Sequence, residues 1–342
     1  MQKAVRRGEA PIALAAAATY LALDATGFWR RLPIIAAEDI GIGDWDLATT
    51  VFLASANEKW RQICGGDWPI ASLLIERMCD CPKERGTAAL TQAALTHPGA
   101  VNDCVNLGGC GTPELLKIVQ DCSMALETRA IAAWYVLGTT SFRGTQLVRR
   151  RGDPAALFST FEDMGVPPKL VGACQLASSR GRYPLAAFLP LLWLAIRRST
   201  PPAISVRETG PTRTSRGIPL YALDKHTSAG KRAIRAFAAT NLPLRRVFDR
   251  YPPIADNIKA VELAVFHAEG VCLRRQLTWD ETERLSSLEL EADLAPLGIR
   301  PEAMVELIRA VEENLWDLDR ARMAVLTGEQ IKHGMSVERG RP

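Results

Sequence analysis

Apolar residues recur at helical spacing through most of the chain, and this periodicity constrains the fold more than any other feature. Segments rich in Ala and Leu follow one another from residues 2–25 to residues 301–325, whereas long segments with strand-like alternation are missing. The hydrophobic content of 47% and the charged content of 23% are those of an ordinary folded protein. We therefore expect an all-α fold, a compact multi-helix bundle or array with short connectors.

Composition and charge divide the helical chain into three regions. Residues 143–275 carry 22 Lys and Arg against 9 Asp and Glu, a balance of +13, whereas residues 276–342 carry 8 against 14, a balance of −6. We expect an N-terminal helical domain, a basic helical domain that holds the candidate site, and acidic C-terminal helices with a tail. Their predicted bounds are 1–98, 99–275 and 276–342.

Two segments lack helical periodicity and are predicted to be loops. Residues 99–111 are rich in Gly, Asn and Cys, and residues 199–227 contain abundant Pro, Thr and Arg. Long irregular loops in compact proteins are often functional. The second loop leads into the densest run of polar residues in the chain, so we expect a site there.

The polar run precedes a predicted helix. It consists of Asp224, Lys225, His226, Thr227 and Ser228. Thr227 or Ser228 can serve as the N-cap, because a hydroxyl accepts a hydrogen bond from a first-turn N–H. The free N–H groups of a helix N-terminus favour an anion, and Lys231, Arg232 and Arg235 lie within two turns of it. The alternative is a capped surface helix with a solvated basic face.

Clustered cations indicate a polyanionic partner, because Lys and Arg neutralise phosphates. Cations also alternate with aromatic residues at 180–183 and 245–251, and such pairs hold phosphates and stack bases, although they also occur as cation–π partners on ordinary surfaces. The predicted nucleic-acid-binding residues are Arg180, Arg182, Arg216, Tyr221, Lys225, Ser228, Lys231, Arg232, Arg235, Arg245 and Arg246.

A carboxylate within this basic region needs a reason, because phosphate repels it. Asp224 is either a structural ion-pair partner of a neighbouring cation or a catalytic group that assists the cleavage of a glycosidic bond. Under the second hypothesis, Asp224 and His226 are the catalytic residues of a DNA glycosylase, a hydrolase that removes a base flipped out of the duplex.

The sequence lacks the patterns of several other chemistries. The eight cysteines are scattered without paired Cys or Cys/His clusters, so we expect reduced thiols and no metal. The serine-nucleophile, HExxH and dinucleotide motifs are also missing, and we expect no cofactor. No apolar run reaches the roughly 18 residues of a membrane helix, so we expect a cytoplasmic protein without membrane contact.

Short motifs recur in order over about residues 1–95. They are QKAVRRG at 2–8, AL at 13–14, WRRL at 29–32, IAAEDIG at 35–41, Asp44, and CPK at 81–83. Together they resemble the C-terminal helical domain of RarA/MgsA-type AAA+ ATPases, which are relatives of clamp loaders. The resemblance implies a collar-like N-terminal domain, a role in oligomerisation and a setting beside DNA-handling ATPase modules.

The resemblance does not extend to ATP hydrolysis, because no GxxxxGK[ST] phosphate loop occurs in the chain. Within the IAAEDIG motif, Glu38 and Asp39 form an acidic pair. We expect this pair to be structural, fixing a helix end near Arg30 and Arg31, with a catalytic carboxylate as the alternative.

Two functions therefore remain open. The first is a DNA-binding protein of DNA maintenance, repair or antiviral defence, acting on double- or single-stranded DNA and carrying its own chemistry as a DNA glycosylase. The second is a non-enzymatic adaptor that forms homo-oligomers or partners a separate AAA+ ATPase.

Overall fold

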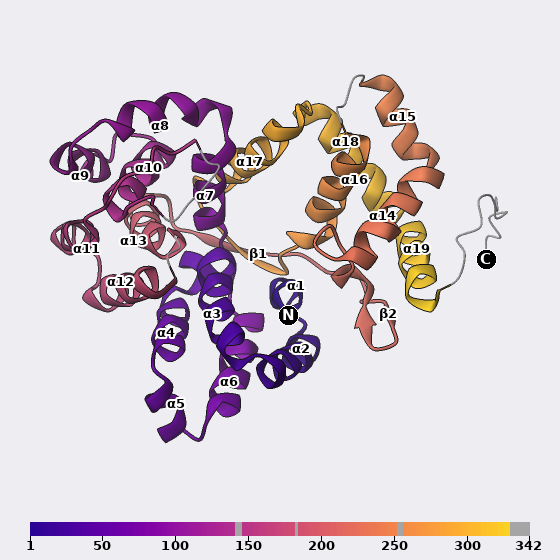
Figure 1. Cartoon of the computed structure of the whole chain (residues 1–342), viewed down its shortest axis with the longest axis horizontal. Coiled ribbons are helices and arrows are strands. Elements are labelled where there is room, and N and C mark those ends of the chain that lie inside the picture. The colour runs from indigo at the N-terminus through magenta and orange to yellow at the C-terminus, as the bar shows by residue number, and fades with distance from the viewer. Residues whose placement is uncertain (141–145, 182–183, 252–255, 329–342) are drawn as a thin grey trace. The chain divides into compact units, whose positions relative to one another are not determined.

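The described part of the chain is mostly helical, which confirms the all-α expectation (Figure 1). The computed structural model describes residues 1–140, 146–181, 184–251 and 256–328, without the side chains of residues 180 and 181. It divides into two compact units. The larger unit comprises residues 1–208 and 273–295, and the smaller unit comprises residues 209–272 and the chain from residue 296 onward.

The larger unit holds most of the helices and one two-stranded ribbon. Its helices are α1 (Gln2–Arg7), α2 (Ala10–Leu23), α3 (Ala25–Ile35), α4 (Trp45–Ala56), α5 (Glu58–Ile63), α6 (Asp67–Asp80), α7 (Gly86–Thr96), α8 (Val101–Gly108), α9 (Thr112–Gln120), α10 (Leu126–Leu137), α11 (Pro154–Asp163), α12 (Pro168–Gly181), α13 (Leu185–Ile196) and α17 (Thr282–Leu294). The ribbon pairs β1 (Ala203–Val206) antiparallel with β4 (Arg275–Thr278), with Ala203 opposite Thr278. A π-helix, Ala36–Ile40, continues α3.

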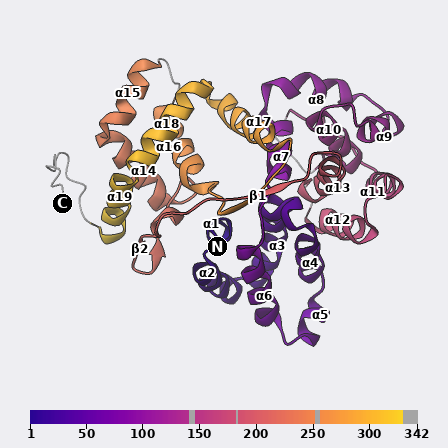
Figure 2. The same ribbon diagram turned by 180° about the vertical axis from the view of Figure 1, so that it is seen from behind.

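The smaller unit is a helical cluster with a short hairpin, seen from behind in Figure 2. Its helices are α14 (Ser228–Thr240), α15 (Leu242–Arg250), α16 (Asn257–Val265), α18 (Pro301–Glu313) and α19 (Leu315–Thr327). The hairpin joins β2 (Thr214–Ser215) to β3 (Ile218–Pro219), and a π-helix, Phe266–Gly270, continues α16. Helix α14 packs against α19 and α16, and α18 packs against α15 and α16.

The core of the larger unit is built around α10 and α13. Nearly every residue of α10 is buried, and the Trp134 ring meets Phe188 of α13 edge-on, with centroids 6.0 Å apart. Helix α17 closes over α7, where the Thr96 hydroxyl donates to the Ala292 carbonyl at 2.8 Å. The chain therefore returns to complete this core about 190 residues after α7.

Local signals explain where several helices begin and end. Asp44 accepts the Leu47 N–H at 2.9 Å and caps α4. The predicted helix over residues 2–25 is interrupted at Gly8, whose φ of +69° ends α1. The predicted helix over residues 301–325 is likewise divided at Asn314.

Residues 99–111 are not a loop, and that prediction was wrong. Helix α8 occupies most of the segment and buries Cys104 and Leu107 in the core. The high Gly and Asn content obscured the short apolar face formed by these two residues, which are three positions apart. Packing of this face stabilises the helix more than intrinsic helix propensity does. The segment over residues 199–227 holds no α-helix and contains β1, β2 and β3.

The two units differ from the three regions expected from composition. Residues 1–98 and 99–208 belong to one unit, and residues 276–295, which include α17, belong to it as well. The regions expected from composition are continuous in sequence, whereas the two units are defined by contacts between segments that are distant in sequence.

Candidate nucleic-acid interface

Asp224 builds the turn that precedes α14. Its side chain is buried, at 5% exposure, and its Oδ1 accepts the His226 N–H at 2.9 Å. Its carbonyl accepts the Thr227 N–H at 3.1 Å and the Thr227 hydroxyl at 3.2 Å. A carboxylate that bonds to a backbone N–H two residues ahead stabilises this kind of turn. Asp224 therefore has a clear structural use in its local backbone.

Thr227 is the N-cap of α14, as one of the two predicted alternatives has it. Its hydroxyl accepts the Gly230 N–H at 3.0 Å, and Ser228 is exposed at the first helical position. Gly230 lies against the Asp224 turn. A Cβ at this glycine would stand 2.1 Å from the Asp224 carbonyl oxygen, so only glycine allows the turn and the helix to approach so closely.

Lys225 and His226 both lie against Phe266 of the π-helix. The Lys225 ammonium is 4.2 Å from the ring centroid, a cation–π contact, and the His226 ring meets Phe266 edge-on with centroids 6.1 Å apart. The structure thus brings Lys225 and His226 together on one aromatic ring. Tyr221, predicted as a base-stacking residue, is buried at 6% exposure.

Arg322 of α19 stabilises the same turn, and this residue was not among those predicted from the sequence. The side chain is completely buried, and its Nε donates to the Leu223 carbonyl at 3.0 Å. Its other nitrogens bind Glu269 at 2.6 and 3.1 Å and Asp319 at 3.0 Å. Burial acts to lower the pKa of Arg322, but the two carboxylates outweigh this effect and raise it above its usual value.

Helix α14 exposes a row of cations on the side away from its core contacts. Lys231, Arg232 and Arg235 are exposed, whereas Ala233, Ile234 and Phe237 are buried. No acidic residue occurs in this helix. Lys231 and Arg235, four residues apart, repel one another, and an anion that binds between them relieves this repulsion.

The cations of α15 have different surroundings. Arg246 is exposed, whereas Arg245 donates to the Ala239 carbonyl near the end of α14. Arg250, outside the predicted set, pairs with Glu306 of α18 at 2.8 Å. Of the α15 cations, Arg246 therefore resembles the α14 row most closely.

Of the three remaining predicted cations, the structure describes the side chain of Arg216 alone. Arg216 is exposed in the turn of the β2–β3 hairpin, where its φ is +52°. Arg182 lies outside the described residues, as does the side chain of Arg180. Arg216 is therefore carried by the hairpin and not by a helix.

The Glu38–Asp39 pair belongs to the larger unit and is tied into a buried network. Asp39 is fully buried, and its Oδ1 accepts Arg6 Nε at 2.7 Å and Arg85 Nη1 at 2.6 Å. Gln2 donates to both acids, at 2.8 Å to Asp39 and 3.0 Å to Glu38. Burial acts to raise the pKa of Asp39, but Arg6 and Arg85 more than compensate and hold it below its usual value.

This network gives the acidic pair a structural use, although with partners other than those expected. Arg31 donates to the Gln2 Oε1 at 2.5 Å and so contacts the network through Gln2, and Arg30 is exposed. The residues of the QKAVRRG and IAAEDIG motifs therefore meet in one ion-pair cluster that joins α1 to the π-helix after α3.

Glu84 is buried beside this network and carries an unusual charge state. Its Oε1 accepts the Gly86 N–H at 2.9 Å and the Trp279 indole N–H at 3.4 Å, whereas its buried Oε2 has no hydrogen-bond partner within the described ranges. Burial raises the pKa of Glu84 from 4.5 to about 7. A substantial fraction of this carboxyl group is therefore protonated at neutral pH.

No group of three or more His, Cys, Asp or Glu side chains suited to a metal ion occurs among the described residues. In that same part of the chain, no helix combines the length and apolarity needed to cross a membrane. No protein-family model, curated protein or solved structure matches this chain.

Proposed function

We propose that the smaller unit binds nucleic acid through a basic face formed by Lys231, Arg232, Arg235 and Arg246. The observation that carries this proposal is the exposed row of cations on α14, a helix without a single acidic residue. Over residues 225–250 the chain has seven Lys and Arg and one acid, Asp249. Such a surface attracts the phosphate backbone, which supplies most sequence-independent affinity.

The proposal concerns binding in DNA maintenance or defence, and it does not require base excision. The Asp224 carboxylate is buried and bonded to the backbone of its own turn, and His226 packs on Phe266. A catalytic acid of a glycosylase needs a protonation state and a position directed at the sugar. Turn formation explains the geometry of Asp224 without that additional role.

The test is a charge-reversal variant, Lys231→Glu with Arg232→Glu and Arg235→Glu, measured by fluorescence anisotropy on labelled single- and double-stranded DNA. We expect at least about a hundredfold weaker binding at moderate salt, because three phosphate contacts become repulsive. The wild-type affinity should fall steeply with salt concentration, and the variant should show a shallower slope.

A matched control carries the same change of charge on the larger unit, with Lys59→Glu, Arg77→Glu and Lys117→Glu at exposed positions. This control should keep the wild-type affinity and salt slope to within about threefold. Equal losses in the two variants would show that net charge alone drives binding and would overturn the proposed face. Undetectable binding of the wild type to both DNA forms would overturn the function.

A further inference from the structure

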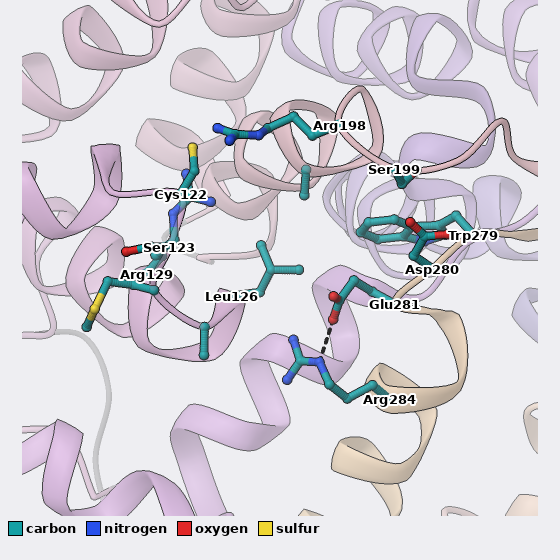
Figure 3. A pocket seen from close by; sticks show the side chains of 13 residues that line it. Cys122, Ser123, Leu126, Arg129, Arg198, Ser199, Trp279, Asp280, Glu281 and Arg284 are labelled. Atoms are coloured by element: carbon teal, nitrogen blue, oxygen red, sulfur yellow. Dashed lines mark hydrogen bonds and ion pairs between the residues drawn. The ribbon is translucent and has the colours of Figure 1, made fainter.

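The larger unit contains a pocket of about 500 Å³ between the start of α10, the end of α13 and the start of α17 (Figure 3). Its lining includes Cys122, Leu126, Arg129, Arg198, Trp279 and Arg284. The volume lies within the range of small-molecule sites. All of these residues belong to the larger unit, so the pocket is independent of the basic face on α14.

Arg129 brings a buried positive charge to one end of the pocket. Arg129 is buried, at 3% exposure. Its Nε and Nη2 both donate to the Val119 carbonyl, at 3.0 and 2.8 Å. In the described parts of the chain, no carboxylate lies within ion-pair distance of it. A buried guanidinium normally has an anionic partner, because desolvating an unpaired charge is costly.

Arg198 adds a second cation at the same end. Figure 3 shows its side chain extending over the pocket toward Cys122. Burial lowers the pKa of Arg129 below its usual value, and the nearby charge of Arg198 lowers it further, against the opposing influences of Cys122 and Asp121. Two guanidinium groups at one end of a pocket favour an anion between them.

The N-terminus of α10 faces the same pocket. Ala125 is its N-cap and provides no side-chain hydrogen bond, and both Ala125 and Leu126 contribute to the pocket lining. This helix has 12 residues, so its uncapped first turn offers free N–H groups and a positive dipole end.

The other end of the pocket carries more acidic than basic side chains, together with apolar surface. Arg284 is paired with Glu127 at 2.7 Å and also with Glu281, and Asp280 is bonded to the Thr200 hydroxyl at 2.5 Å. Leu126, Ala195 and Trp279 contribute apolar surface. The unbalanced positive charge is therefore confined to the end that holds Arg129 and Arg198.

We propose that this pocket binds a small-molecule phosphomonoester, with its phosphate at Arg129, Arg198 and the start of α10. A phosphomonoester carries a charge of about −1.5 to −2 at neutral pH, which matches two guanidinium groups. Its organic part lies against Leu126, Ala195 and Trp279. The inference rests on a buried cation, a second cation and a helix N-terminus that meet in one cavity.

Cys122 provides a direct readout of occupancy, because its partly exposed thiol lines the pocket. The experiment measures alkylation of Cys122 by iodoacetamide in the full chain, by peptide mass spectrometry, with AMP, UMP, adenosine and inorganic phosphate as probes. AMP or UMP should slow the alkylation of Cys122, and adenosine should not. Cys64, an exposed thiol outside the pocket, reports any general effect of the probes.

Arg198→Gln tests the cation without disturbing the core, because Arg198 is exposed. We expect it to raise the concentration of nucleotide needed for protection about tenfold. The control is Arg197→Gln, at the neighbouring exposed residue, whose guanidinium stacks 4.7 Å from the Trp193 ring centroid. It should leave protection unchanged.

Three results would overturn the proposal. The first is no protection of Cys122 by AMP or UMP up to about 10 mM, well above the dissociation constant of even a weak site. The second is equal protection by adenosine, which lacks the phosphate. The third is an equal effect of Arg198→Gln and Arg197→Gln.

Discussion

At the residue scale, Asp224 joins a turn to a helix through bonds that its carboxylate and carbonyl make within four residues. Its usefulness follows from the short side chain, which reaches the backbone N–H of His226 without strain. The same reach is available to asparagine but not to alanine. This difference separates a structural role from a catalytic one.

Asp224→Ala should lower the free energy of unfolding by about 1 kcal/mol, because the partly buried hydrogen bond to the His226 N–H is lost. Asp224→Asn should cost much less, since an amide oxygen can accept the same bond. Chemical denaturation monitored by circular dichroism measures both. Wild type, Asp224→Asn and Asp224→Ala should all leave DNA intact after alkali treatment. Alkali-sensitive breaks made by wild type and lost in Asp224→Asn would instead establish a glycosylase.

Glu84 makes stability depend on pH. Below about 4.5 its carboxyl is protonated in both the folded and the unfolded chain, so it has no effect. Between 4.5 and about 7 only the unfolded chain loses the proton, so the folded state is progressively disfavoured, and above about 7 the penalty is constant.

Glu84→Gln should therefore stabilise the protein by about 1–3 kcal/mol at pH 8 and leave it nearly unchanged at pH 4, because the amide keeps the Oε1 acceptor without the buried charge. Denaturant titrations at the two pH values measure this difference. A stabilisation that is equal at both would contradict the assigned cause.

At the element scale, α14 is held by a close backbone approach at one end and by α19 along its side. Gly230 permits the approach, and the buried Arg322 of α19 bonds to the Leu223 carbonyl just before the helix. The position of the basic face therefore depends on contacts that lie beneath it.

Gly230→Ala should destabilise the protein by about 1–3 kcal/mol, because the new Cβ would collide with backbone atoms that cannot move aside. Gly172 of α12 is the matched control, since a Cβ there meets nothing within 4 Å. Gly172→Ala should stabilise the protein by about 0.5–1 kcal/mol through helix propensity. Thermal unfolding of the two variants measures both effects, and a shift in the same direction would refute the steric argument.

The sequence predicts those features that depend on residues close to one another along the chain. The caps at Asp44 and Thr227 and the exposure of Lys231 follow from local hydrogen bonds and helical periodicity. It does not predict the β1–β4 ribbon or the bond from Arg322 to Leu223, because these join segments about 70 and 99 residues apart. The cations of the candidate site can therefore be predicted from the sequence, whereas the buried contacts that hold them in place cannot.

At the scale of the whole molecule, the two units have separate interiors. Among the described residues, the main apolar core draws its members only from the larger unit. The helices of the smaller unit pack on one another around Ile234, Phe237 and Leu307. Damage to one interior should therefore remain local.

Hydrogen exchange of the Gly230→Ala variant tests this separation. Amides of α14, α16 and α19 should exchange at least about tenfold faster than in the wild type, because local opening of the smaller unit becomes easier. Amides of α10 and α13 should keep their wild-type rates. Faster exchange in all five helices would mean that the chain unfolds as one cooperative body.

The path of the chain through these units affects how the protein can be synthesised. The larger unit needs α17, and α17 follows the first segment of the smaller unit and precedes its second segment. A ribosome that has completed residue 208 has therefore released a helical body with α7 still uncovered. That surface stays open to chaperones until α17 emerges, and a single cut after residue 272 leaves both units incomplete.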